Sequence, residues 1–108
     1  MEKVIRNGEV AILISQGFGA GWYSWNTKYP QLLFHPKLIE MVENNKQNDT
    51  EDEEIKEWLG LSDNDYIFTG GISDLKIEWV KQGTAFRIDE YDGAESLVLL
   101  DNHNIITA

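Results

Sequence analysis

The chain has 108 residues, a formal net charge of −10 and no cysteine. A chain of this length can bury one modest core, so we expect a single domain over residues 1–108. The lack of cysteine excludes disulfides, thiolate metal sites and a cysteine nucleophile, and it fits a reducing compartment. The first residues contain no long apolar run, so neither a signal peptide nor a membrane span is predicted.

The negative charge is concentrated in one segment. Residues 40–65, the acidic insert, hold ten acidic and two basic side chains and so carry most of the net charge. Such a surface repels nucleic acids and anionic membranes, which we therefore exclude as partners. It would attract a basic protein surface. The alternative is a solvated face that keeps the protein soluble.

A β-hairpin is predicted at the N-terminus. Asn7-Gly8 supplies the two residues that tolerate positive φ in a tight turn, and β-branched residues flank it. The second arm, residues 10–14, is apolar on both faces, so it should be a central strand that is covered on both sides.

Two helices are predicted next. Pro36 fits the first turn of one helix, and apolar residues then repeat at helical spacing. His35, just before it, is expected to cap that helix or to face solvent. Thr50 and Glu53 stand at capping-box spacing at the start of the second helix, and Gly60 should end it.

The last part of the chain indicates strands and turns. Short strands are expected at 66–69, 75–80, 86–89 and 96–100, with turns at Gly83 and at Asp92-Gly93. The predicted fold class is therefore α+β: an N-terminal β-hairpin, two short helices and a C-terminal antiparallel meander, forming one sheet with the helices on one face. The expected core residues are Ile12, Ile14, Leu38, Val42, Ile55, Trp58, Ile77, Trp79, Phe86, Ile88 and Leu97.

The stretch GFGAGWYSWN, residues 17–26, is the most unusual part of the sequence, and we call it the Gly-aromatic loop. It is not a dinucleotide fingerprint, because Trp22 stands where the third glycine is required, and it lacks the Gly-Lys-Ser/Thr of a P-loop. Gly19 and Gly21 are predicted to need positive φ or a close neighbour.

The aromatic residues of this loop have three interpretations: a stacking surface for a flat ligand, a secondary core, or a subunit interface. We expect Trp22 and Trp25 to differ, one buried in the protein's own core and the other lining a groove or an interface.

Other candidate sites are weaker. Arg87, in the middle of a predicted strand, could pair with a carboxylate or bind an anion. Acids cluster at 89, 90 and 92, and paired carboxylates can act as a general acid and base. Asp89 and Glu90 are successive strand residues, however, and so point to opposite faces. The spacing Asp63-x-Asp65 fails as a calcium loop, and His35 and His103 lack further ligands for zinc. We therefore expect no enzyme, no metal and no cofactor.

Three blocks, GFGAGW, EWV..GT.FRI and EYDG.ES, together resemble a family of small uncharacterised proteins encoded by phages and prophages. The resemblance covers most of the chain except the acidic insert. It implies a small, non-enzymatic accessory protein in the cytoplasm of a host cell, with counter-defence as one role. It implies no site residues, because no activity is established for the family.

The functional hypothesis from the sequence is binding of a small flat or anionic ligand, such as a nucleotide, in the manner of a nucleotide sponge. The site would lie at the boundary between subunits of a homo-oligomer. Its expected residues are Gly19, Gly21, Trp22, Tyr23, Trp25 and Arg87.

An alternative is an acidic inhibitor that blocks a basic surface of a host nuclease or defence protein. Its expected residues are Glu51, Asp52, Glu53, Glu54 and Glu57. A structural accessory protein without a ligand is the third hypothesis.

Overall fold

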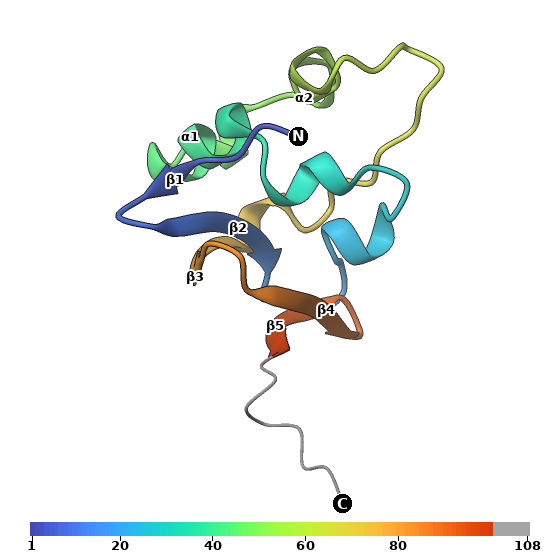
Figure 1. Cartoon of the computed structure of the whole chain (residues 1–108). Helices are drawn as coiled ribbons and strands as arrows, with labels where there is room; N and C mark the ends of the chain where they lie inside the picture. The colour runs from blue at the N-terminus through green and yellow to red at the C-terminus, as the bar shows by residue number, and fades with distance from the viewer. Residues whose placement is uncertain (101–108) are drawn as a thin grey trace, which may run out of the picture.

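The computed structural model describes residues 1–100, with seven helices and strands connected by loops and short turns of 3₁₀ helix (Figure 1). The strands are β1 (Ile5–Arg6), β2 (Glu9–Ser15), β3 (Leu75–Lys81), β4 (Ala85–Tyr91) and β5 (Ala94–Leu100), the helices are α1 (Pro36–Glu43) and α2 (Asp52–Leu59), and the 3₁₀ turns are η1 (Tyr23–Trp25), η2 (Pro30–Leu33), η3 (Gln47–Asp49) and η4 (Ile72–Asp74).

The N-terminal hairpin forms as predicted. Asn7 and Gly8 both have positive φ, at 53° and 79°, and β1 pairs antiparallel with β2 around them. Two successive positive φ angles match the right-handed twist of the flanking strands, which explains the choice of Asn-Gly here.

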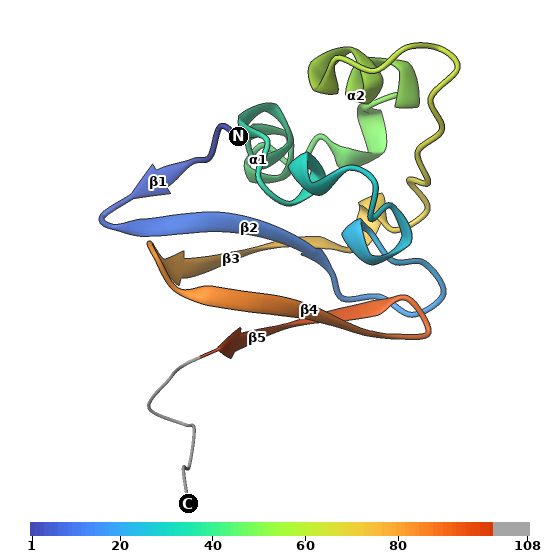
Figure 2. The same ribbon diagram turned by 45° about the vertical axis from the view of Figure 1, so that its right-hand side comes forward.

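The α+β class is confirmed, but the strands divide between two antiparallel sheets, β1-β2-β3 and β4-β5, and the prediction of one sheet is wrong. β3 pairs with β2 along its whole length, from Lys81 opposite Glu9 to Leu75 opposite Ser15. After β3 the chain turns through Gly83, which has φ +87°. β4 then pairs with β5 and lies below the first sheet (Figure 2).

The result is three layers, with the three-stranded sheet between the two helices and the β4-β5 hairpin (Figure 2). Ala11 and Leu13 of β2 join the core cluster that contains the helix residues. Their neighbours Val10 and Ile12 point the other way, into a second cluster that includes Phe86 of β4. The predicted two-sided burial of β2 is thus confirmed.

Both helices form as predicted, except at the start of α2. His35 caps α1, because its Nδ1 accepts a hydrogen bond from the amide of Lys37 at 3.1 Å. The prediction of a Thr50–Glu53 capping box at the start of α2 is wrong. The N-cap is Glu51, and the hydroxyl of Thr50 donates to the carbonyl of Lys46 at 2.7 Å. Gly60 ends α2 in the left-handed conformation, as predicted.

The predicted strand at 66–69 is absent, because a side chain takes the place of a neighbouring strand. The amide of Phe68 donates to Asn26 Oδ1 at 2.7 Å, and its carbonyl accepts from Asn26 Nδ2 at 2.8 Å. Asn26 is itself buried, so this pair of hydrogen bonds fixes the segment to the Gly-aromatic loop.

The core differs from the expected list in its outer members. Ile12, Ile14, Leu38 and Ile55 are fully buried as predicted. The other seven expected core residues are only partly buried: Val42, Trp58, Ile77, Trp79, Phe86, Ile88 and Leu97. Phe86, Ile88 and Leu97 belong to the two-stranded sheet at the outside of the molecule. The side chains of such an outer sheet are less buried than those of a central sheet.

Candidate functional site

The two predicted glycines of the Gly-aromatic loop have the expected constraints. Gly19 has φ +92°, a conformation that side chains rarely adopt. At Gly21 an added Cβ would lie 2.6 Å from Ser24 Oγ and 2.7 Å from Trp25 Cδ1. The loop therefore needs glycine at both positions, for backbone conformation at one and for packing at the other.

Trp22 is a core residue. Its side chain is completely buried in the cluster that contains the helix residues. The indole Nε1 donates to the carbonyl of Leu32 at 2.8 Å, which satisfies the one polar atom of the ring. Trp22 therefore has no surface to offer to a ligand.

Trp25 lies at the surface, as the predicted difference between the two tryptophans requires. It is 42% exposed and packs at a tilt against Phe68, with 5.0 Å between the ring centroids. Its Nε1 donates to Glu90 at 3.0 Å. Trp25 thus contacts the β4-β5 hairpin rather than one of the hollows of the surface.

The anion held by the Gly-aromatic loop is the protein's own Glu95. One carboxylate oxygen of this buried side chain accepts from the amide of Ser15 at 2.8 Å. The other accepts from the amides of Trp22 at 3.0 Å and Ser24 at 2.8 Å, and from the hydroxyl of Ser24 at 2.7 Å. Two backbone amides of the Gly-aromatic loop, those of Trp22 and Ser24, are therefore occupied by a side chain of the same chain.

The turn of the β4-β5 hairpin packs directly on this loop. The amide of Gly19 donates to the carbonyl of Asp92. A Cβ at Gly93 would overlap the backbone of Ala20, so only glycine allows this approach. The GFGAGW and EYDG.ES blocks of the sequence thus lie against each other, and this contact explains why both blocks contain glycine.

The neighbouring acids of the hairpin, Asp89 and Glu90, have separate partners. Glu90 accepts hydrogen bonds from Trp25 Nε1 and, at 2.6 Å, from the amide of Gly93, and these two bonds lower the pKa of Glu90. Asp89 instead accepts from Arg87 Nε at 2.8 Å. This bond raises the pKa of the Arg87 guanidinium.

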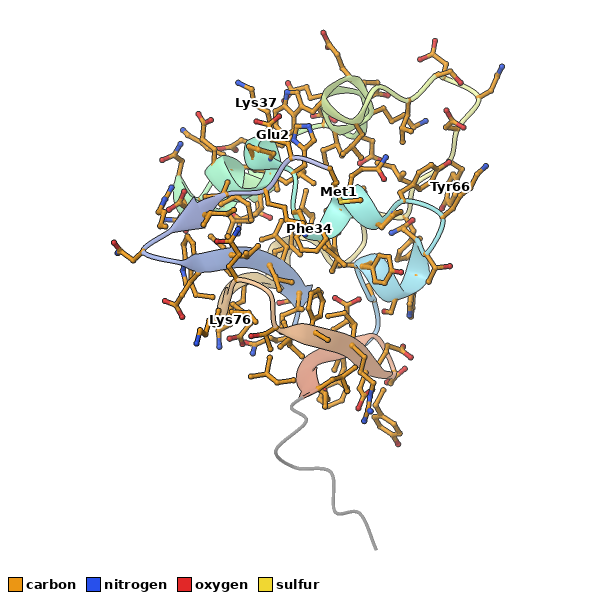
Figure 3. All side chains as sticks on the ribbon, in the orientation of Figure 1. Met1, Glu2, Phe34, Lys37, Tyr66 and Lys76 are labelled. Atoms are coloured by element: carbon orange, nitrogen blue, oxygen red, sulfur yellow. The ribbon has the colours of Figure 1, made fainter. Side chains whose placement is uncertain are left out.

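Two hollows lie beside β4, and both are lined by Phe34 and Phe86, which make an edge-to-face contact with 6.1 Å between their ring centroids. Phe34 lies near the middle of the molecule in Figure 3. The Lys3 hollow, of about 240 Å³, is lined by Lys3, Val10, Ile12, Phe34, Val80, Lys81, Gly83, Thr84, Ala85 and Phe86. The Tyr23 hollow, of about 420 Å³, is lined by Tyr23, Leu33, Phe34, Phe86, Arg87 and Ile88.

The residues that line these hollows include Lys3, Lys81 and Arg87 and no acidic residue, although the chain has 19 acidic and nine basic residues. The ammonium of Lys3 lies 4.6 Å from the centroid of the Phe34 ring. Of the expected ligand-binding residues, Tyr23 and Arg87 come together here, whereas Gly19, Gly21 and Trp22 belong to the packing described above.

The five expected partner-binding acids lie on and before α2, and all are exposed. Asp52 accepts a hydrogen bond from the hydroxyl of Thr69 at 2.7 Å. Within residues 1–100, the three ion pairs are Arg6–Glu43, Lys76–Glu78 and Arg87–Asp89, so none neutralises these acids. Glu54 also lines a hollow of about 290 Å³ between α1 and α2.

Sequence reasoning missed Glu95, Phe34 and Lys3. A signal existed for Glu95, because it alternates with Leu97 and so falls on the inward face of β5, where a charged residue needs partners. No periodicity indicated Phe34 or Lys3, because both lie outside regular helices and strands.

In residues 1–100, no three side chains of metal-ligating type come together. His103 lies outside the described residues. In the same part of the chain, every helix is too short or too polar to cross a bilayer.

The chain was compared with family models, with curated proteins and with solved structures. No family model matches it, and no curated protein or solved structure is significantly similar to it.

Proposed function

We propose that this protein is a non-enzymatic accessory protein of the phage type that binds a small anionic ligand with a flat ring in the Lys3 hollow. A nucleotide is one ligand of this kind. The observation that carries the proposal is the position of the Lys3 ammonium over the Phe34 ring, in a hollow without an acidic lining residue.

The charge of this hollow opposes that of the whole chain. A net charge of −10 repels anions in general, so an anion would bind where positive charge is gathered and acids are absent. Lys3 makes none of the ion pairs of the described residues, so its charge is available to a ligand.

The walls of the hollow suit a flat ring. Phe34 and Phe86 contribute aromatic surface, and Val10, Ile12 and Val80 contribute aliphatic surface. Predominantly apolar lining with a few polar groups is typical of small-molecule sites. The ring would pack on the phenyl groups, and the anion would pair with the lysine.

A binding screen tests this proposal. Ring-containing anions, namely nucleoside monophosphates and aromatic carboxylates, are compared with their neutral analogues by thermal shift and calorimetry. We expect anions to raise Tm and neutral analogues to have little effect. Lys3→Met keeps the apolar stem and should weaken anion binding by roughly tenfold to a hundredfold.

The matched control is Lys28→Met. Lys28 also places its ammonium over an aromatic ring, 5.7 Å from the centroid of Tyr29, but it lies outside the Lys3 hollow. This variant should bind like the wild type. Equal loss in both variants would place the anion outside the Lys3 hollow, and no anion bound by the wild type would leave an accessory protein without a ligand. Either outcome overturns the proposal.

A second candidate function is inhibition of a protein that has a basic surface. It is supported by the exposure of Glu51, Asp52, Glu53, Glu54 and Glu57 and by the absence of ion pairs to them within residues 1–100. Charge pairing at an exposed surface weakens steeply with salt.

The test of this candidate replaces Glu51 and Glu54 by Gln and Asp52 by Asn. Asn at 52 keeps an acceptor for Thr69, so Tm should move by only a few degrees. The replacement should abolish a salt-sensitive interaction with a basic host protein. Biological activity that survives it eliminates this candidate.

A further inference from the structure

The strand β4 has an unpaired edge. It pairs with β5 on one side, and no other strand of residues 1–100 pairs with it on the other. The pair Tyr91–Ala94 closes a two-residue turn, so residues 87, 89 and 91 exchange hydrogen bonds with β5. The N–H and C=O groups of Phe86, Ile88 and Glu90 therefore point away from β5. An edge of this kind is a template for another strand.

We propose that a second copy of this chain pairs with this edge, β4 against β4, antiparallel and with Ile88 opposite the partner's Ile88. The five residues 86–90 would form about six backbone hydrogen bonds with their counterparts. The two hairpins would become one four-stranded sheet across a two-fold axis. This inference is independent of the proposed ligand.

The charges on β4 select this register. Pairing centred on Ile88 places Arg87 directly opposite the partner's Asp89, twice over, at the close-packed positions of the ladder. The neighbouring registers with the same backbone bonding are centred on residue 87 or on residue 89. They place Arg87 opposite the partner's Arg87, or Asp89 opposite the partner's Asp89, and like charges in direct opposition are destabilising.

The Tyr23 hollow gives this pairing an apolar contact. Ile88 lies on the inward face of β4 and lines that hollow, and directly paired residues of two strands share a face. The partner's Ile88 would therefore enter the Tyr23 hollow beside Leu33 and Phe34. The Lys3 hollow begins at Phe86, where the paired segment ends.

The experiment is a charge exchange between two chains, read by native mass spectrometry. The wild type should be dimeric at roughly 100 µM, a concentration at which micromolar Kd values give dimers. Arg87→Asp alone, or Asp89→Arg alone, places like charges opposite one another and should weaken the dimer by about tenfold or more. A mixture of the two variants places opposite charges in both pairs and should form heterodimers.

The control uses the same kind of pair on another strand. Lys76 and Glu78 on β3 form an ion pair two residues apart, as Arg87 and Asp89 do on β4. Lys76→Asp and Glu78→Arg should leave the wild-type dimer intact, and mixing them should not change it. Circular dichroism verifies that each variant is folded. If a β4 variant unfolds, Arg87→Gln and Asp89→Asn replace the pair, and each should weaken the dimer.

The heterodimer is the decisive outcome, because the Arg87–Asp89 pair within one chain cannot produce it. A wild-type monomer at this concentration, or variants that behave alike alone and mixed, would overturn the proposal. A dimer that responds equally to the β3 and β4 exchanges would place the interface elsewhere.

Discussion

The carboxylate of Glu95 accepts a hydrogen bond from the amide of Trp22, which lies 73 positions earlier in the chain. The same carboxylate also binds the amides of Ser15 and Ser24 and the hydroxyl of Ser24. A single buried charge thus joins the end of β2, the Gly-aromatic loop and β5. Its desolvation is offset by four donors, three of which are backbone amides.

Removal of this carboxylate should therefore be costly. Glu95→Ala leaves three amides without a partner, and we expect a loss of about 3–5 kcal/mol in the free energy of unfolding. Glu95→Gln keeps one acceptor oxygen but directs an NH₂ group at a donor, so a loss of about 1–3 kcal/mol is expected. Urea unfolding measures both losses.

The control for these variants is Glu9→Gln, an exposed glutamate at the start of β2. It removes the same charge and should change the free energy of unfolding by less than about 0.5 kcal/mol. If Glu95→Gln and Glu9→Gln are equally stable, the four hydrogen bonds of Glu95 do not hold the hairpin in place.

A pair of glycine variants separates backbone strain from packing. Gly83 and Gly93 both have φ +87°, so alanine is strained by about 1–2 kcal/mol at either position. At Gly83 nothing lies within 4 Å of an added Cβ, whereas at Gly93 it would overlap the backbone of Ala20. Gly93→Ala should therefore lower the free energy of unfolding clearly more than Gly83→Ala. Equal losses would mean that the hairpin turn does not press on the loop.

The two tryptophans should also separate. Trp22→Ala removes a fully buried side chain and the bond to Leu32, and we expect a loss of about 3–5 kcal/mol in the free energy of unfolding. Trp25→Ala removes a ring that is 42% exposed and should cost no more than about 1–2 kcal/mol. Thermal unfolding followed by circular dichroism compares them, and a reversed order would contradict the burial of Trp22.

Local patterns predicted much of this fold because local physics determines those parts. Asn7-Gly8, Gly60 and His35 each act within a few residues, at a turn or at a helix end. The division into two sheets depends instead on where β4 goes after Gly83, and alternation along a strand does not specify its neighbour. The prediction of a strand at 66–69 was wrong for the same reason, since the partner of this segment is the side chain of Asn26, which is distant in the sequence.

The candidate site was less predictable than the fold. The need for glycine at positions 19 and 21 was predictable, because glycine is required where φ is positive, as at Gly19, or where a neighbour lies close, as at Gly21. The occupant of the loop was not, since an amide binds a ligand's anion and a buried glutamate equally well. The Lys3 hollow is lined by residues of both sheets together with Lys3 and Phe34, and no short stretch of sequence contains all of them.

The hydrogen bonds of Glu90 should make the docking of the hairpin sensitive to acid. Hydrogen bonds from the Trp25 indole, which has the larger effect, and from the amide of Gly93 hold the pKa of Glu90 below its ordinary value of 4.5 in the folded protein. A carboxyl group whose folded pKa is lowered contributes stability that is present above the unfolded pKa and is lost as the pH falls through the folded pKa.

Glu90→Gln keeps an acceptor for Trp25 but does not titrate, so the wild type should exceed it in stability at pH 7, and this difference should shrink below about pH 4.5. Urea unfolding of the two proteins between neutral and acidic pH measures the difference, with Glu9→Gln as the control for the loss of one negative charge. A difference that stays constant or grows on acidification would show that the Glu90 carboxylate gains nothing from Trp25 and Gly93.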